Sequence, residues 1–134
     1  MTELDFSSIL DAFSSPILIA KPIYNGSKIK DFELVFKNNA FTNTINKEIS
    51  DCTKFSELKD KLCKSVPWID LGEKAANNIY VEPMEYYSEI SQGWFSIQMR
   101  SASNGELIVV NLENVTNKHI QDEKLKETAF IDNL

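Results

Sequence analysis

Two short segments of the chain are apolar at every position, and this feature constrains the fold most. They are Ile17-Leu18-Ile19-Ala20 and Leu107-Ile108-Val109-Val110. A strand that is covered on one face alternates apolar and polar residues, whereas a strand covered on both faces is apolar throughout. We therefore expect the two segments to be neighbouring strands in the middle of one sheet.

Further strands are indicated at residues 32–36, 81–90 and 94–99. Asn25-Gly26 lies between the first two strands, and both residues tolerate the positive φ angles that a tight hairpin turn needs. Pro83 places the strand 81–90 at an edge, because proline cannot donate a hydrogen bond inside a sheet. The sequence thus predicts a five-stranded antiparallel sheet in the spatial order 2-1-5-4-3.

Helical spacing of apolar residues appears before, between and after these strands. An amphipathic N-terminal helix that ends before Pro16 would carry Phe6, Ile9, Leu10 and Phe13. Residues 38–76 contain three short helical groups, which we expect to fold over one face of the sheet. We therefore expect an α+β fold with a capping helix at 1–15, one domain at 16–116, and an exposed, charged helix at 117–134 that leads to an effector domain.

The composition excludes several functional classes. The formal charge is -6, with twenty acidic against fourteen basic residues, and such a chain repels the phosphates of a nucleic acid. The N-terminus has no basic leader and no apolar run reaches the length of about 18 residues that a membrane span needs. We expect a cytoplasmic location without direct membrane contact, although a membrane segment elsewhere in a longer parent protein stays open.

Catalytic machinery is not visible in the sequence. Cys52 and Cys63 have no second pair to complete a metal site and are expected to be reduced, packed thiols. His119 is the only histidine and falls in the polar last helix, so no base can be placed beside a nucleophile. We expect no enzymatic activity and no metal site.

The order of these elements, together with two local motifs, resembles the PAS domain. Phe36-Lys37-Asn38-Asn39-Ala40-Phe41 is similar to the aromatic-x-Asn-x-Ala-Phe passage of that family, and Leu112 to Lys118 is similar to its closing Asp-Ile-Thr motif. Two positions differ, because Asn46 stands where the first helix commonly ends in Gly and Asn114 stands where the closing motif has Asp. The first change is mild, whereas the second replaces a charge-assisted hydrogen bond by a weaker amide bond.

The resemblance implies a sensory or regulatory module, bacterial and without catalysis of its own. Haem ligation in this family uses a histidine on the helix before the third strand, where residues 67–78 have none, and His119 is expected to face solvent. The flavin-adduct passage of light-sensing members requires Arg and Gln residues that are absent around Cys52. We therefore expect neither haem nor a covalent flavin, and the cofactor stays unknown.

A small-molecule pocket, if one is present, would lie between the helices and the sheet. The polar atoms of Tyr86 and Ser88 would fix such a ligand. The expected pocket lining consists of Leu34, Phe36, Phe41, Ile45, Leu71, Ala75, Tyr86, Ser88, Phe95, Ile97 and Met99.

Trp94 falls on the opposite face of the sheet from this pocket and needs a cover there. The N-terminal helix with Phe6, Ile9, Leu10 and Phe13 would provide it, either within one chain or across a homodimer.

The signal output is expected at Asn114, Val115 and Thr116, which join the last strand to the last helix. The final residues, Ala129 to Leu134, resemble the opening of GGDEF diguanylate cyclase domains, so a cyclase is the expected effector and a histidine kinase the alternative. Two other functional classes stay open: a ligand-free interaction platform, and a small enzyme with a cone-shaped pocket, which the absence of a base argues against.

Overall fold

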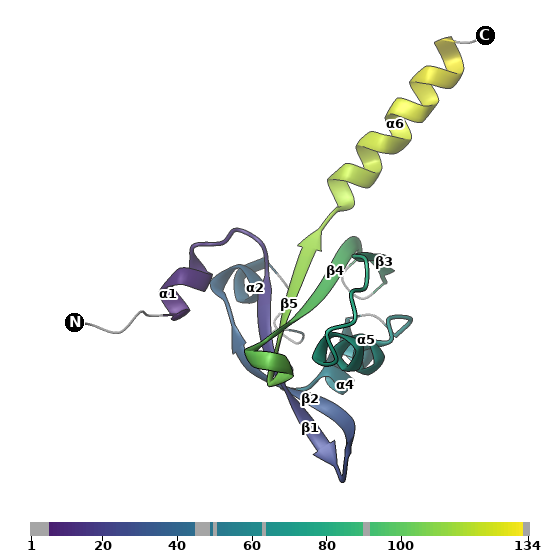
Figure 1. Ribbon diagram of the computed structural model, residues 1–134. Coiled ribbons are helices and arrows are strands. Elements are labelled where there is room, and N and C mark those ends of the chain that lie inside the picture. Colours follow the sequence, from purple (N-terminus) through teal and green to yellow (C-terminus); the bar gives the residue numbers. More distant parts are fainter. Residues whose placement is uncertain (1–5, 45–48, 50, 63, 90–91, 133–134) are drawn as a thin grey trace.

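The computed structural model describes residues 6–44, 49, 51–62, 64–89 and 92–132. Its centre is one antiparallel sheet in the order β2-β1-β5-β4-β3. The strands are β1 (Ile17–Asn25), β2 (Lys28–Lys37), β3 (Met84–Ser88), β4 (Gly93–Ala102) and β5 (Leu107–Asn114). This order confirms the predicted α+β, PAS-like fold (Figure 1).

The two central strands are less evenly covered than their apolar sequences predict. In β5, the side chains of Ile108, Val110 and Leu112 are fully buried, whereas Val109 is half-buried and Asn111 is exposed. The helices α4 (Phe55–Lys61) and α5 (Trp68–Ala76) pack against β2, β4 and β5 on one face of the sheet. The expectation of burial on both faces is therefore wrong for β5, although its central position is confirmed.

The β1–β2 hairpin extends beyond the rest of the sheet. Only Ile17 to Ala20 of β1 pair with β5, and the remainder of the hairpin projects past it (Figure 1). The hairpin turns at Gly26, whose φ of 65° lies in the left-handed region that glycine adopts without strain. A register shift between Ile19 and Ala20 interrupts the alternation of β2 near its end. The predicted hairpin is confirmed, but its turn is Gly26-Ser27, because Asn25 is the last residue of β1 and pairs with Lys28.

Strand β3 is shorter than predicted. It begins at Met84, directly after Pro83, and ends at Ser88, where the sequence predicts a strand over 81–90. Proline lacks the N–H that a ladder needs, which explains why pairing begins only after it. Strand β3 pairs with β4 and is the edge strand that Pro83 indicates.

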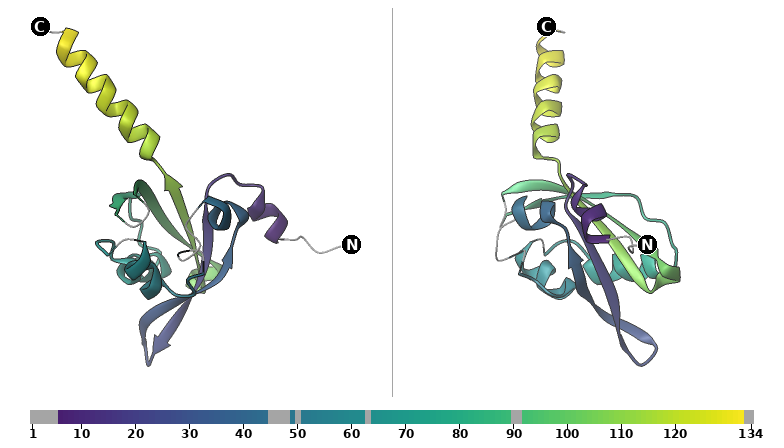
Figure 2. Two further views of the ribbon diagram at one scale, coloured as in Figure 1. Left: turned by 180° about the vertical axis from the view of Figure 1, so that it is seen from behind. Right: turned by 90° about the vertical axis from the view of Figure 1, so that its left-hand side faces the viewer.

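The first described helix, α1 (Phe6–Asp11), ends before the predicted boundary at residue 15 and precedes β1 (Figures 1 and 2). The buried side chain of Asn38 ties it to the domain. Asn38 Nδ2 donates to the carbonyl oxygens of Leu10 and Ser15, both at 3.0 Å. Its Oδ1 accepts from the backbone N–H of Ile17 at 2.8 Å and of Phe41 at 3.0 Å, which caps α2 (Asn39–Thr44). One amide therefore holds three segments together.

Aromatic rings fill the space between helices and sheet. Phe32 of β2 contacts Phe55 at a centroid distance of 4.7 Å, and Phe55 contacts Trp68 at 5.9 Å. The series continues from Trp68 to Tyr86 and Phe95 on β3 and β4. Gly72 of α5 allows this packing, because a Cβ there would lie 2.5 Å from the ring of Phe32.

The last helix, α6 (Thr116–Asp132), leaves the end of β5 and points away from the sheet (Figures 1 and 2). It contacts β4, and two of its side chains contact Glu85 of β3. Ile120 and Leu125 are exposed on it. In the described part of the chain, none of the helices combines the length and apolar character needed to cross a bilayer.

Candidate functional site

Most of the residues expected to line a possible interior pocket lie in the packed core between the helices and the sheet. Seven of its expected lining residues belong to the buried core: Phe41, Leu71, Ala75, Tyr86, Phe95, Ile97 and Met99. Leu34 packs partly buried against them, whereas Phe36 lies outside this cluster after the register shift in β2, and Ile45 lies outside the described residues. The hollow beside Leu71, Met84, Ile97 and Met99 has a volume of about 10 Å³. That is the space of at most one water molecule.

The two polar residues expected to hold a ligand both point into the packed interior. Ser88 is 1% exposed, and its Oγ donates to the carbonyl oxygen of Leu62 at 2.5 Å. Tyr86 is 5% exposed and stacks on Phe95. A larger hollow of about 650 Å³ opens at the surface beside β3, where Glu85, Tyr86 and Tyr87 form one wall. Ser88 therefore serves packing in this structure.

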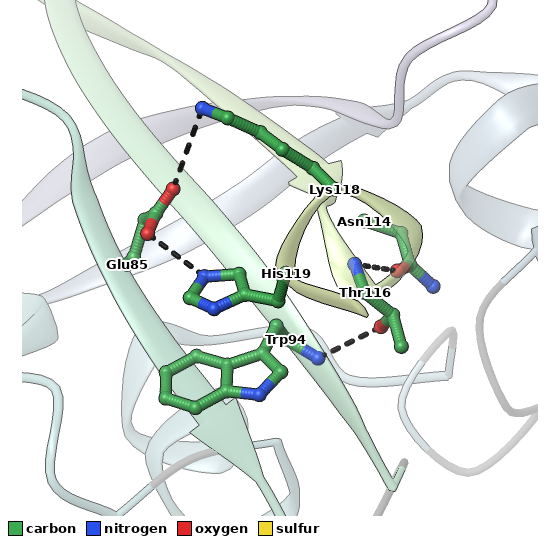
Figure 3. A network of polar contacts seen from close by, with 6 residues as sticks. All are labelled: Glu85, Trp94, Asn114, Thr116, Lys118 and His119. Atoms are coloured by element: carbon green, nitrogen blue, oxygen red, sulfur yellow. Dashed lines mark hydrogen bonds and ion pairs between the residues drawn. The ribbon is translucent and has the colours of Figure 1, made fainter. Parts of the chain in front are cut away.

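The predicted output segment forms a compact junction between β4, β5 and α6 (Figure 3). Val115 donates its backbone N–H to the carbonyl oxygen of Trp94 at 2.8 Å, which continues the pairing of β4 and β5. Trp94 in turn donates its backbone N–H to Thr116 Oγ1 at 2.9 Å. Val115 is 6% exposed, so its side chain anchors the junction from the inside. The first residue of α6 is thus bonded to β4 as well as to β5.

Asn114 replaces the expected carboxylate without losing the hydrogen bond. Its Oδ1 accepts from the backbone N–H of Thr116 at 3.0 Å and closes an Asx turn at the start of α6 (Figure 3). An amide oxygen and a carboxylate oxygen can both accept this bond. The substitution therefore keeps the geometry of the turn and removes only the charge next to the positive end of the helix dipole.

Gly93 permits the close approach of β4 to α6. A Cβ at this position would lie 2.9 Å from Thr116 Oγ1, which is the atom that accepts from Trp94. A larger residue here would therefore force the Thr116 side chain or β4 to shift.

His119 lies in the junction, so the expectation that it faces solvent is wrong. Its imidazole stacks on the indole of Trp94 at a centroid distance of 4.2 Å and an interplanar angle of 7°. Its Nε2 lies 2.9 Å from Oε2 of Glu85 on β3, and Nζ of Lys118 lies 4.0 Å from the other carboxylate oxygen. Figure 3 shows Glu85 reaching from β3 to both side chains of α6.

Sequence reasoning missed this arrangement because Glu85 and His119 are 34 positions apart. The only available signal was the alternation of β3, which places Glu85 on the same face of the sheet as Trp94.

Within the described residues of one chain, Trp94 receives its cover from α6 and β3, whereas the expected cover by the N-terminal helix of a second copy stays a prediction. His119 stacks on its indole, and Tyr87 contacts it edge-on at 5.6 Å. The N-terminal helix is held at Asn38 instead, where Ile9 and Phe13 are exposed and Leu10 is half-buried. The side chain of Phe6 lies outside the described residues.

Cys52 is the buried thiol that the sequence predicts, at 1% exposure. Burial, followed by the nearby carboxylate of Glu57, raises the pKa of the Cys52 thiol above its ordinary value. The neutral thiol is therefore the favoured form in the folded protein. Cys63 and Asn46 lie outside the described residues.

Comparison with known proteins supports the fold. No family model matches the sequence, and no curated protein does. Among solved structures, the chain is similar to an RNA-binding light-oxygen-voltage receptor, with a TM-score of 0.58 and 15% sequence identity over 99% of this chain. The match covers 42% of the receptor chain, so this chain spans less than half of its length. At this identity the likeness concerns the PAS-like fold.

Proposed function

We propose that this chain is a sensory module whose output is the docking of α6 on β4. One observation carries the proposal: Thr116, the first residue of α6, accepts a hydrogen bond from Trp94, and its neighbour Val115 donates one back. Because β4 also contributes Phe95, Ile97 and Met99 to the core, a displacement of the core reaches the root of α6 through one strand. Coupling of this kind between two sites amounts to about 1–3 kcal/mol in typical allosteric proteins.

The stimulus acts on the domain either as a small ligand or as a partner protein. Because the hollow in the core holds at most one water molecule, a ligand would enter only after the core has opened, and a partner protein would bind the outer surface. The charged helix leads to an effector. Residues 129–134 resemble the start of GGDEF domains, which favours a diguanylate cyclase as that effector. A cytoplasmic homodimer without catalysis of its own completes the proposal.

The second candidate is an interaction platform that binds no ligand. The hollow of about 10 Å³ beside Leu71 and Ile97, which is too small for an organic ligand, favours it. Native mass spectrometry of the purified chain separates the two, because a sensor that holds its ligand appears with added mass.

An engineered cavity tests the sensor proposal without knowledge of the ligand. Ile97 is 2% exposed on β4 and lies opposite Met84 on one side and Leu112 on the other. The Ile97→Ala variant creates an apolar hole of the kind that binds xenon. If β4 transmits core displacement, xenon pressure shifts the amide NMR signals of Val115 and His119 more than that of Lys28 in the hairpin.

Ile97→Val serves as the control, because its smaller hole leaves less room for the gas. Equal shifts at the root of α6 and in the hairpin would contradict the proposal. If Ile97→Ala does not fold, Met99→Ala places the hole two residues along the same strand.

A further inference from the structure

The edge strand β3 makes its own attachment to α6, separate from the attachment through β4. Glu85 of β3 contacts His119 Nε2 at 2.9 Å and Lys118 Nζ at 4.0 Å, and both partners belong to the first turn of α6. The Thr116 hydroxyl, by contrast, bonds to the backbone of β4. Two strands thus hold the same helical turn through different atoms (Figure 3).

We propose that Glu85 is a positioning residue that makes the orientation of α6 depend on the position of β3. This inference rests on the proposed output through α6 and names a second input to it. The carboxylate holds the imidazole of His119 flat on the indole of Trp94, which is why the two rings are nearly parallel at 7°. The same carboxylate lies 4.0 Å from Nζ of Lys118, so two side chains of the first turn of α6 contact it.

The contact between Glu85 and α6 can transmit a movement of β3, because β3 lies at the edge of the sheet. Because β3 is the edge strand, β4 alone pairs with it in the described sheet, and it can shift with less loss of pairing than a central strand. Its inner face carries Tyr86 in the core, and its outer face carries Glu85 at the root of α6. A molecule that displaces β3 at the surface hollow of about 650 Å³, which Glu85 and Tyr86 line, therefore moves the carboxylate that holds His119.

The NMR signals of the His119 imidazole measure whether α6 is docked. It is the only histidine of the chain, so its ring protons give one assignable pair of NMR signals. Protons that lie over the face of an indole are displaced upfield by the ring current, and the displacement measures how often the two rings are stacked. The stack is an attachment of α6 and reports the docked state directly.

Glu85→Ala in the full chain is expected to lower the ratio of stacked to unstacked His119 about two- to fivefold, the usual range for a partly exposed ion pair. Glu85→Gln, which keeps a hydrogen-bond acceptor without the charge, is expected to recover part of that loss. Glu82→Ala removes an equal charge from an exposed residue three positions away and is expected to leave the stack unchanged.

The same Glu85 substitution in a Thr116→Val chain separates the role of Glu85 from the proposed output through β4. In Thr116→Val, which lacks the hydroxyl that bonds to β4, the Glu85→Ala change is expected to unstack His119 further, because two parallel attachments are then both weakened. If Glu85→Ala leaves the stack unchanged in both backgrounds, the role of Glu85 is refuted while the β4 attachment stands. If Glu82→Ala unstacks the rings as much as Glu85→Ala, the effect is one of net charge and the inference also fails.

Discussion

The hydroxyl of Thr116 is the contact whose removal tests the junction most cleanly. Thr116→Val replaces it with a methyl group of nearly the same shape and keeps a β-branched residue at the start of α6. The backbone N–H of Trp94 then loses the acceptor that lies 2.9 Å away. A part-buried hydrogen bond contributes about 1 kcal/mol, within a range of roughly 0.5–1.5 kcal/mol.

A loss of about 1 kcal/mol corresponds to about a fivefold change in an equilibrium constant. Hydrogen exchange of two amides measures it: Val115, which donates to Trp94, and His119, which donates to Val115 at 3.0 Å. Both amides are expected to exchange about fivefold faster in Thr116→Val. The chemical denaturation midpoint is expected to change less, because the core does not contain this bond.

Thr42→Val is the matched control. Its hydroxyl is exposed and donates to the carbonyl oxygen of Asn39 within α2, far from the junction in the chain. Exchange at Val115 and His119 is expected to stay unchanged there. Unchanged exchange in Thr116→Val, or an equal rise in Thr42→Val, would refute the assignment of Thr116 as an anchor.

Three further changes have expected outcomes. Asn38→Ala removes an amide that makes four hydrogen bonds and is expected to lower the free energy of unfolding, measured in urea, by about 3 kcal/mol, whereas Asn39→Ala on the exposed neighbour lowers it little. A decrease below about 1 kcal/mol in Asn38→Ala would contradict the account. Asn114→Asp keeps the hydrogen bond to Thr116 and adds a negative charge at the start of α6, so hydrogen exchange of the His119 amide should slow by a factor that corresponds to about 0.3–1 kcal/mol. Faster exchange would show that the added charge is unfavourable. Because burial raises the pKa of Cys52, the folded protein keeps its thiol proton to a higher pH than the unfolded chain does, and the free energy of unfolding should fall as the pH rises above the ordinary thiol pKa of 9.0. The same fall in Cys52→Ala would exclude this thiol as the cause.

The order of the strands could be predicted because each strand carries its own local signal. Ile17 to Ala20 and Leu107 to Val110 are apolar throughout, and Pro83 indicates an edge. Asn25-Gly26 predicts a hairpin between the first two strands, and Gly26 adopts a positive φ in the turn that the structure forms there. Local patterns of this kind do not depend on contacts between distant residues.

The contents of the interior and the surroundings of His119 could not be predicted in the same way. Alternation places Tyr86 and Ser88 on the inner face, but whether a pocket remains depends on how Trp68, Phe55 and Phe32 pack together. A polar last helix predicts an exposed histidine, and the stack on Trp94 arises only because α6 begins beside β4. The register shift that removes Phe36 from the core likewise leaves no mark in the sequence.

The orientation of α6 relative to the sheet tests the central claim most directly. Residual dipolar couplings of backbone amides in a weakly aligned sample report the direction of each N–H bond. If the junction holds α6, the couplings of residues 117–125 fit the same alignment tensor as those of β4 and β5 in the wild-type chain, and they diverge from it in Thr116→Val. Couplings of α6 that are already averaged toward zero in the wild type would show that the helix moves independently of the sheet, and the account would be wrong.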